Sequence, residues 1–268
     1  MVLKKTVARC LGAFIPIRTK RKEFRRRFSG GPSIVPARES ALAHNYLDGL
    51  NGIEIGASTQ NDFGLRNAGG AYATVDFDPT QGGKWQTSGF APAQVNIVAN
   101  GDDLPFKDES LDYVLSSHVI EHCFDPIKAL EEWLRVVKKG GYLFIIVPHK
   151  ERTFDRNRDI TPLDELINRH NGILTIHDYA YMQTKEANNR GYGAENQQVI
   201  LDTPHLLIAN QEILEGWTRF EQDDHHHWSA WTTKPFLELC RHLQLNIVEV
   251  QDPDDKVGNG FTVVIQKT

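Results

Sequence analysis

The sequence feature that most constrains the fold is a series of short apolar runs separated by helical segments. The runs cover residues 52–55, 73–75, 95–98, 113–115 and 142–147. Runs of this length that alternate with helices are typical of a parallel sheet with helices on both faces. Two further runs near the end of the chain, 245–250 and 261–266, indicate that the sheet resumes there.

The clearest helix lies between the fourth and fifth runs. Asp125 can cap it and Pro126 fits its first turn. We expect Gly140 and Gly141 to end it, and Glu131 to pair with Arg135 on its solvent face. Its expected buried stripe is Ile127, Leu130, Leu134 and Val137.

The composition is that of an ordinary soluble protein. The 268 residues are 40% hydrophobic and 24% charged, and no apolar run approaches the ~18 residues that span a bilayer. Cys10, Cys123 and Cys240 are few and scattered, so we expect neither a disulfide framework nor a zinc ribbon. These properties favour a reducing cytoplasm.

The basic residues are concentrated at the amino terminus. Residues 1–28 hold ten basic side chains and one acid, whereas the rest of the chain carries 20 basic and 34 acidic side chains. Apolar residues at helical spacing accompany the positive charge. Such a segment can lie on an anionic membrane surface or bind a partner; the alternative is a frayed helix on the acidic body. No nucleic-acid-reading module is present, so we expect no nucleic-acid partner.

A turn of small residues follows the first run. Gly56, Ala57 and Ser58 let backbone N–H groups come close to a ligand. Asp76 ends the second run, where a carboxylate can accept hydrogen bonds from both hydroxyls of a ribose. The pair predicts a nucleoside-containing cofactor. A G-x-G-x-x-G string is absent, because Ser58 and Gln60 stand where glycines are common, which disfavours NAD.

Three further segments extend this pattern in a characteristic order. They are NGDDLPF at 100–106, DESLDYVLSSHVIEH at 108–122 and RVVKKGGYLFIIVP at 135–148. With the first turn, they resemble the class I S-adenosylmethionine-dependent methyltransferases, in particular the small-molecule branch. The resemblance implies a Rossmann-like α/β fold with a seven-stranded, mostly parallel sheet and an antiparallel closing strand. It also implies S-adenosylmethionine as cofactor and S-adenosylhomocysteine as product.

The resemblance assigns roles to residues at the carboxyl edge of the sheet. Asp76 would hold the ribose, Phe77 would lie against the adenine, and either Asn100 or Asp102 would take the adenine amino group. The residues implied around the methionine part are Glu54, Gly56, Ala57 and Ser58. Gly101 would line the adenine edge, and Ser117 and His118 would close the site beside the sulfonium.

The resemblance also suggests a division of the chain. We expect a basic segment and linker at 1–37, a cofactor-binding core at 38–148, an inserted substrate cap at 149–234, and the closing part of the core sheet at 235–268. Within the cap, the sequence predicts helices at 162–169 and about 206–217. More than eighty residues between two strands is too long for a bare loop.

The candidate catalytic and substrate residues lie in or beside the cap. A hydroxyl acceptor needs a general base, for which His149, His225 and His227 are candidates. The ring of Trp228 could stack on a sugar. Arg156 and Arg158 are candidate substrate-binding residues that could grip a phosphate or carboxylate, and Asp155 could orient them; the alternative is a solvated loop.

The HVIEH segment, 118–122, fits the H-x-x-E-H pattern of inverted zinc peptidases. It follows a predicted strand and precedes a helix start, which leaves little room for a peptidase helix, so we expect no metal. The sequence therefore predicts a cytoplasmic methyltransferase acting on a hydroxyl of a sugar, glycolipid or nucleotide-linked sugar, similar to bacterial members encoded with surface-polysaccharide enzymes. The alternatives are a non-catalytic scaffold on the same fold and a zinc hydrolase built on HVIEH.

Overall fold

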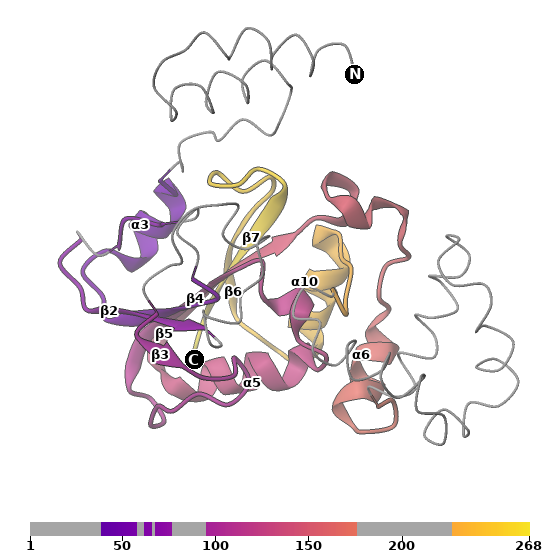
Figure 1. Cartoon of the computed structure of the whole chain (residues 1–268), viewed down its shortest axis with the longest axis horizontal. Helices are drawn as coiled ribbons and strands as arrows, with labels where there is room; N and C mark the ends of the chain where they lie inside the picture. The colour runs from indigo at the N-terminus through magenta and orange to yellow at the C-terminus, as the bar shows by residue number, and fades with distance from the viewer. Residues whose placement is uncertain (1–38, 58–61, 66–67, 77–94, 176–226) are drawn as a thin grey trace, which may run out of the picture. The chain divides into compact units, whose positions relative to one another are not determined.

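The computed structural model describes residues 39–57, 62–65, 68–76, 95–175 and 227–268. They form a seven-stranded sheet in the order β3-β2-β1-β4-β5-β7-β6 (Figure 1). The strands are β1 Gly52–Ile55, β2 Tyr72–Asp76, β3 Ile97–Val98, β4 Leu111–Ser117, β5 Val137–Pro148, β6 Ile247–Gln251 and β7 Gly260–Gln266. β1 to β5 pair in parallel, and β7 runs antiparallel to both β5 and β6. The predicted Rossmann-like sheet with an antiparallel closing strand is confirmed.

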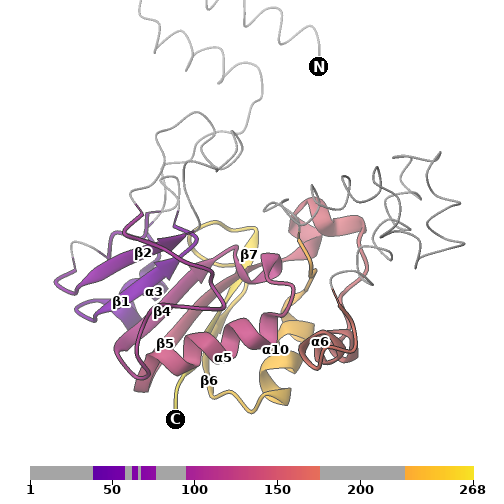
Figure 2. The same cartoon turned by 60° about the horizontal axis from the view of Figure 1, so that its bottom comes forward.

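Helices cover both faces of the sheet (Figure 2). On one face pack α5 (Pro126–Val136) and α10 (Thr233–His242), and α6 (Leu163–His170) packs against these two helices. On the other packs α3 (Ala41–Leu47), which buries its apolar side against β4, β5 and β7. The central strands are therefore buried on both sides, which explains why they read as continuous apolar runs.

Helix α5 begins as predicted but ends earlier. The carboxylate of Asp125 accepts a hydrogen bond from the Lys128 N–H at 2.9 Å, and Pro126 occupies the first turn. The helix ends at Val136, so Gly140 and Gly141 do not stop it but lie within β5. A Cβ on Gly141 would come within 2.4 Å of the Asp112 carbonyl oxygen, so this position requires glycine for strand pairing.

The predicted pair of Glu131 with Arg135 is wrong. Arg135 instead binds Glu132 and Asp108, each at 2.7 Å. It also donates to the carbonyl oxygens of Leu104 and Phe106. Arg135 therefore anchors the turn that leads into β4, a role that helical spacing alone does not reveal.

Several predictions fall outside the described residues, namely the basic segment 1–37, the helix at 206–217 and the middle of the expected cap. The described ends of the cap hold α6, within one residue of its predicted bounds. Among the described helices, none is long and apolar enough to span a bilayer.

Candidate active site

In the turn after β1, the backbone at Gly56 lies close to the ends of two neighbouring strands. Ile55 pairs with Ser116 of β4, so the turns after both strands lie at the same edge of the sheet. Gly56 has φ +71° and donates its N–H to the Val75 carbonyl at 2.8 Å. A Cβ on Gly56 would lie 2.4 Å from Cγ2 of Val119, so only glycine fits here. The Val119 side chain therefore fills the space beside Gly56, and packing within the turn requires glycine at this position.

The other residues predicted around this turn are placed in part. Glu54 is buried on β1, and Ala57 is buried directly after Gly56. Asp76 is the last residue of β2, paired with Val98 of β3, which places its backbone at the carboxyl edge. Ser58 and Phe77 lie outside the described residues.

The stretch after β3 is tied to α5. The indole N–H of Trp133 donates to the Gly101 carbonyl at 2.7 Å. The Asp102 carboxylate pairs with Lys128 at 2.9 Å, whereas Asn100 is exposed. Asn100 and Asp102 therefore both remain candidates for the adenine amino group.

Ser117 ends β4 and His118 follows it, at the same edge of the sheet as the glycine turn. His118 has φ +56° and donates its N–H to the Ile146 carbonyl at 2.9 Å. Its Nε2 is buried, with no hydrogen-bond partner among the described residues. Burial lowers the pKa of His118 to about 4, so the imidazole is neutral at neutral pH. A neutral ring with an unused nitrogen suits a site for a positively charged sulfonium, because it adds no repulsion.

Further along the same edge lies what we call the buried polar cluster, Glu121, His122, Asp155 and His227. Nδ1 of His227 is 2.6 Å from the Asp155 carboxylate, which also binds Arg158 at 2.9 Å. Burial raises the pKa of Asp155, but the hydrogen bonds and charges of His227 and Arg158 outweigh it and hold that pKa below its ordinary value.

Glu121 is fully buried at the centre of this cluster. Burial, together with the nearby charge of Asp155, raises the pKa of Glu121 to about 8. Both its carboxylate oxygens are without a hydrogen-bond partner among the described residues. The Glu121 carbonyl accepts from the Trp228 N–H at 2.7 Å, and this bond holds the segment from 227 onward beside it.

His149 follows β5 directly, at the same edge of the sheet. Its N–H donates to the Asn259 carbonyl at 3.0 Å, and its ring packs edge-on against Phe261. Burial is the largest of the influences that lower the pKa of His149, so its ring is neutral at neutral pH. His225, the remaining base candidate, lies outside the described residues.

Comparison with known proteins agrees with this geometry. Residues 53–145 match a family described as a methyltransferase domain. An uncharacterized methyltransferase of Mycolicibacterium paratuberculosis is 36% identical over 106 residues, 38% of each chain. A malonyl-[acyl-carrier protein] O-methyltransferase of a Marinomonas strain is 40% identical over 47 residues, 18% of this chain and 17% of that protein. The chain thus matches well under half the length of these relatives.

Residues 53–145 are a class I methyltransferase domain. Its cofactor is S-adenosylmethionine, and the turn at Gly56 and the neutral His118 fit that group. A solved S-adenosylmethionine-dependent methyltransferase from Aquifex aeolicus covers 82% of this chain and 84% of its own, with 14% identity and a TM-score of 0.41. The fold assignment rests on the strand order and the family match.

The substrate side of the methyltransferase domain differs from expectation at two positions. Trp228 is 7% exposed and packs edge-on against Phe124, with ring centroids 5.3 Å apart, so no open ring face is available to a sugar. Asp155 pairs with Arg158, as predicted for a residue that orients it, whereas Arg156 is exposed and no ion pair between it and Asp155 is present among the described residues.

The HVIEH segment does not have the geometry of a zinc peptidase. His118 ends a strand in a left-handed conformation, and only Ile120–His122 forms a short 3-10 turn. His118 and His122 therefore do not share a helix face, as two ligands of that motif must.

Sequence reasoning missed two organising residues. Arg169 of α6 is buried and donates to the carbonyl oxygens of Phe124 and Trp228 and to the Ser229 hydroxyl, so it ties the cap residues to the end of β4. Asp254 accepts hydrogen bonds from four backbone N–H groups of residues 256–260 and closes the loop before β7. The turn-rich DPDDKVGNG string signals the second, whereas nothing local signals the first.

Proposed function

We propose that the protein transfers a methyl group from S-adenosylmethionine to a hydroxyl oxygen of a sugar, glycolipid or nucleotide-linked sugar. The observation that supports methyl transfer is the match of residues 53–145 to a methyltransferase domain. The sheet of that domain carries the Gly56 turn and His118 at its carboxyl edge, and Nε2 of His118 has no hydrogen-bond partner among the described residues. The acceptor class rests on resemblance to glycan-associated members, and one relative's name specifies an O-methyltransferase.

The cofactor supplies a methyl carbon already activated by its sulfonium. When bound, it would give this methyl group to the acceptor oxygen, and the electrons of the broken carbon–sulfur bond would stay on sulfur. The hydroxyl proton must pass to a base. We assign this role to His149, because its ring is neutral at neutral pH and it follows the strand next to β4. Nε2 of His227, the other described candidate, faces the Glu121 carboxylate at 3.8 Å.

The basic segment 1–28 belongs to the same proposal. Its ten positive side chains would hold the protein at an anionic membrane surface or on an acidic partner, close to a glycolipid acceptor.

Calorimetric titration with S-adenosylhomocysteine and mass spectrometry of a glycan panel test the proposal. We expect one cofactor site that Asp76→Ala abolishes. We expect His149→Gln to lower kcat by about 10²–10⁴ with cofactor affinity unchanged, since general-base catalysis contributes that much. His242→Gln, a change at the exposed end of α10, is the matched control. Cofactor binding without any methylated product would instead support the scaffold alternative.

A further inference from the structure

We propose that Glu121, His122 and His227 bind a first-row divalent metal ion at the carboxyl edge of the sheet. The evidence for metal binding comes from these residues and the residues around them. A role of the metal in methyl transfer rests on the proposed function. The expectation from sequence was that no metal is present, and the three-dimensional arrangement is the reason to revise it.

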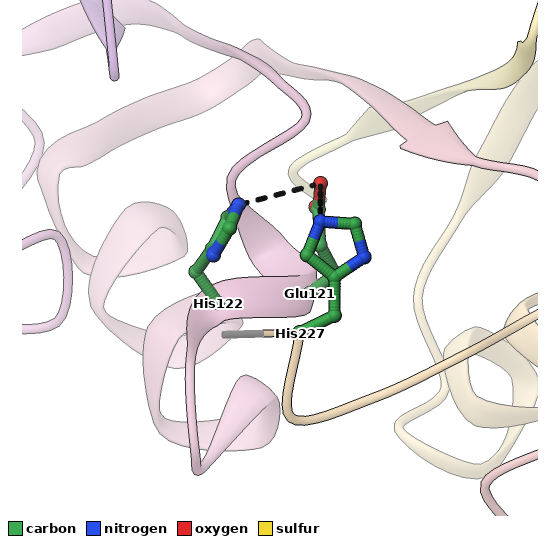
Figure 3. Close-up of side chains that lie close together, drawn as sticks. All are labelled: Glu121, His122 and His227. Carbon is green, nitrogen blue, oxygen red and sulfur yellow. Dashed lines mark ion pairs between the residues drawn. The ribbon is translucent and has the colours of Figure 1, made fainter. Parts of the chain in front are cut away.

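The first argument is the convergence of three ligand atoms. Figure 3 shows one nitrogen of each imidazole, of His122 and of His227, facing the same carboxylate oxygen of Glu121. Nε2 of each ring is 3.8 Å from Oε1 of Glu121, and one ligand atom from each residue lies within 4.8 Å of the others. These distances are too long for hydrogen bonds. Atoms bound at about 2.0–2.2 Å to one ion are roughly 3–3.6 Å apart, so small side-chain rotations would close the site.

The second argument is the state of Glu121. Its side chain is fully buried, and both oxygens are without a hydrogen-bond partner among the described residues. A buried carboxyl group without a hydrogen bond is costly, and proteins usually satisfy such groups with hydrogen bonds or use them to coordinate metals. A divalent cation between Glu121 and the two rings supplies the missing partner.

The third argument is the orientation of His227. Its Nδ1 is held by Asp155 at 2.6 Å, which fixes the ring and directs Nε2 toward Glu121. A carboxylate behind a histidine is the usual support of a metal-binding imidazole. Arg158 in turn binds Asp155, so the support is itself held in place. Asp155 is therefore a positioning residue.

Two imidazoles and one carboxylate suit Zn²⁺, Co²⁺, Fe²⁺ or Mn²⁺ and leave coordination positions open. An acceptor hydroxyl is the class of ligand that the proposed function would bring to those positions. This assignment also leaves His149 as the base, since metal binding would occupy Nε2 of His227.

The test is a Co²⁺ titration of the full-length chain after removal of metal with EDTA, followed by visible absorption and calorimetry. We expect one equivalent to bind and Glu121→Gln to weaken binding at least 100-fold. We expect Asp155→Asn to weaken binding 10- to 100-fold, the range for the loss of a residue that orients a ligand. If Glu121→Gln does not fold, His122→Gln replaces it.

The matched control is His170→Gln. His170 lies 3.0 Å from Asp125 and 3.9 Å from Glu131, so it offers the same residue types on the surface. It should leave Co²⁺ binding unchanged. Equal binding by the wild type and Glu121→Gln, or loss of binding in His170→Gln alone, overturns the site.

Methyl transfer is measured in parallel, with and without Co²⁺. Transfer by a protein that binds no Co²⁺ would overturn the metal site and leave the proposed function standing. Specific Co²⁺ binding by a protein that does not bind the cofactor would support the metal site and overturn the proposed function.

Discussion

The strand-end turn, made of Gly56, Ala57, Ser117 and His118, and the buried polar cluster lie at the same edge of the sheet but are held differently. Backbone hydrogen bonds to neighbouring strands fix the turn, from Gly56 to Val75 and from His118 to Ile146. Side chains from three separate segments fix the cluster, with Asp155 and His227 separated by 72 positions. The turn therefore depends on backbone conformation and space, whereas the cluster depends on charges that compensate one another.

The largest expected effect is in the cluster. Asp155→Asn removes the charge that faces both His227 and Arg158 in a buried setting, and we expect it to lower the free energy of unfolding by about 3–5 kcal/mol. The control is Asp108→Asn, which removes an equally short bond to Arg135 but at a carboxylate that is 76% exposed. Asp108→Asn should lower the free energy of unfolding by less than about 1 kcal/mol. Urea unfolding of both variants measures the difference, and equal losses would contradict the contrast between the two settings.

The same contrast explains what the sequence could predict. The positions of most strands, the start of α5 and the Gly56 turn follow from local patterns, because apolar runs, small residues and caps act within a few positions. The seven-stranded sheet with its antiparallel closing strand was instead implied by the family resemblance. The sequence shows the HVIEH motif, but it does not show which distant residues the side chains of the motif contact. Glu121 acquires its role only because a backbone bond from Trp228 brings a distant segment beside it.

The end of α5 shows the same limit at short range. Two glycines after a helical stripe predict a stop, yet the chain already pairs as β5 from Val137. Pairing with Leu111 of β4 overrides the local signal. Only the neighbouring strand, which is absent from a local pattern, decides where the helix ends.

The next effect concerns the turn. Gly56→Ala places a Cβ 2.4 Å from Cγ2 of Val119 at a positive φ, and we expect cofactor affinity to fall about 100-fold as the turn shifts. Gly56→Ala should also lower the free energy of unfolding by about 2–4 kcal/mol, because it adds backbone strain and overpacking. Gly69→Ala is the control, since Gly69 also has a positive φ, +87°, but an added Cβ meets nothing within 4 Å. Gly69→Ala should lower the free energy of unfolding by about 1 kcal/mol. It should leave the affinity for S-adenosylhomocysteine, measured by calorimetry, unchanged.

The smallest effect is the pH dependence that His118 gives to the turn. Its pKa is lowered from 6.5 to about 4 by burial, so the unfolded chain binds a proton between these values that the folded chain excludes. The contribution of the neutral His118 ring to the free energy of unfolding is therefore fully present above pH 6.5 and is lost as the pH falls toward 4. We expect His118→Gln to flatten this part of the profile by roughly 2 kcal/mol relative to wild type. The control is His242→Gln, a change at the exposed end of α10. Parallel urea titrations at pH 4.5 and 7 measure the difference between variants, which removes the shared contribution of the carboxylates. Identical profiles for wild type and His118→Gln would mean that the ring is protonated without cost, and the turn would then offer no neutral surface to a sulfonium.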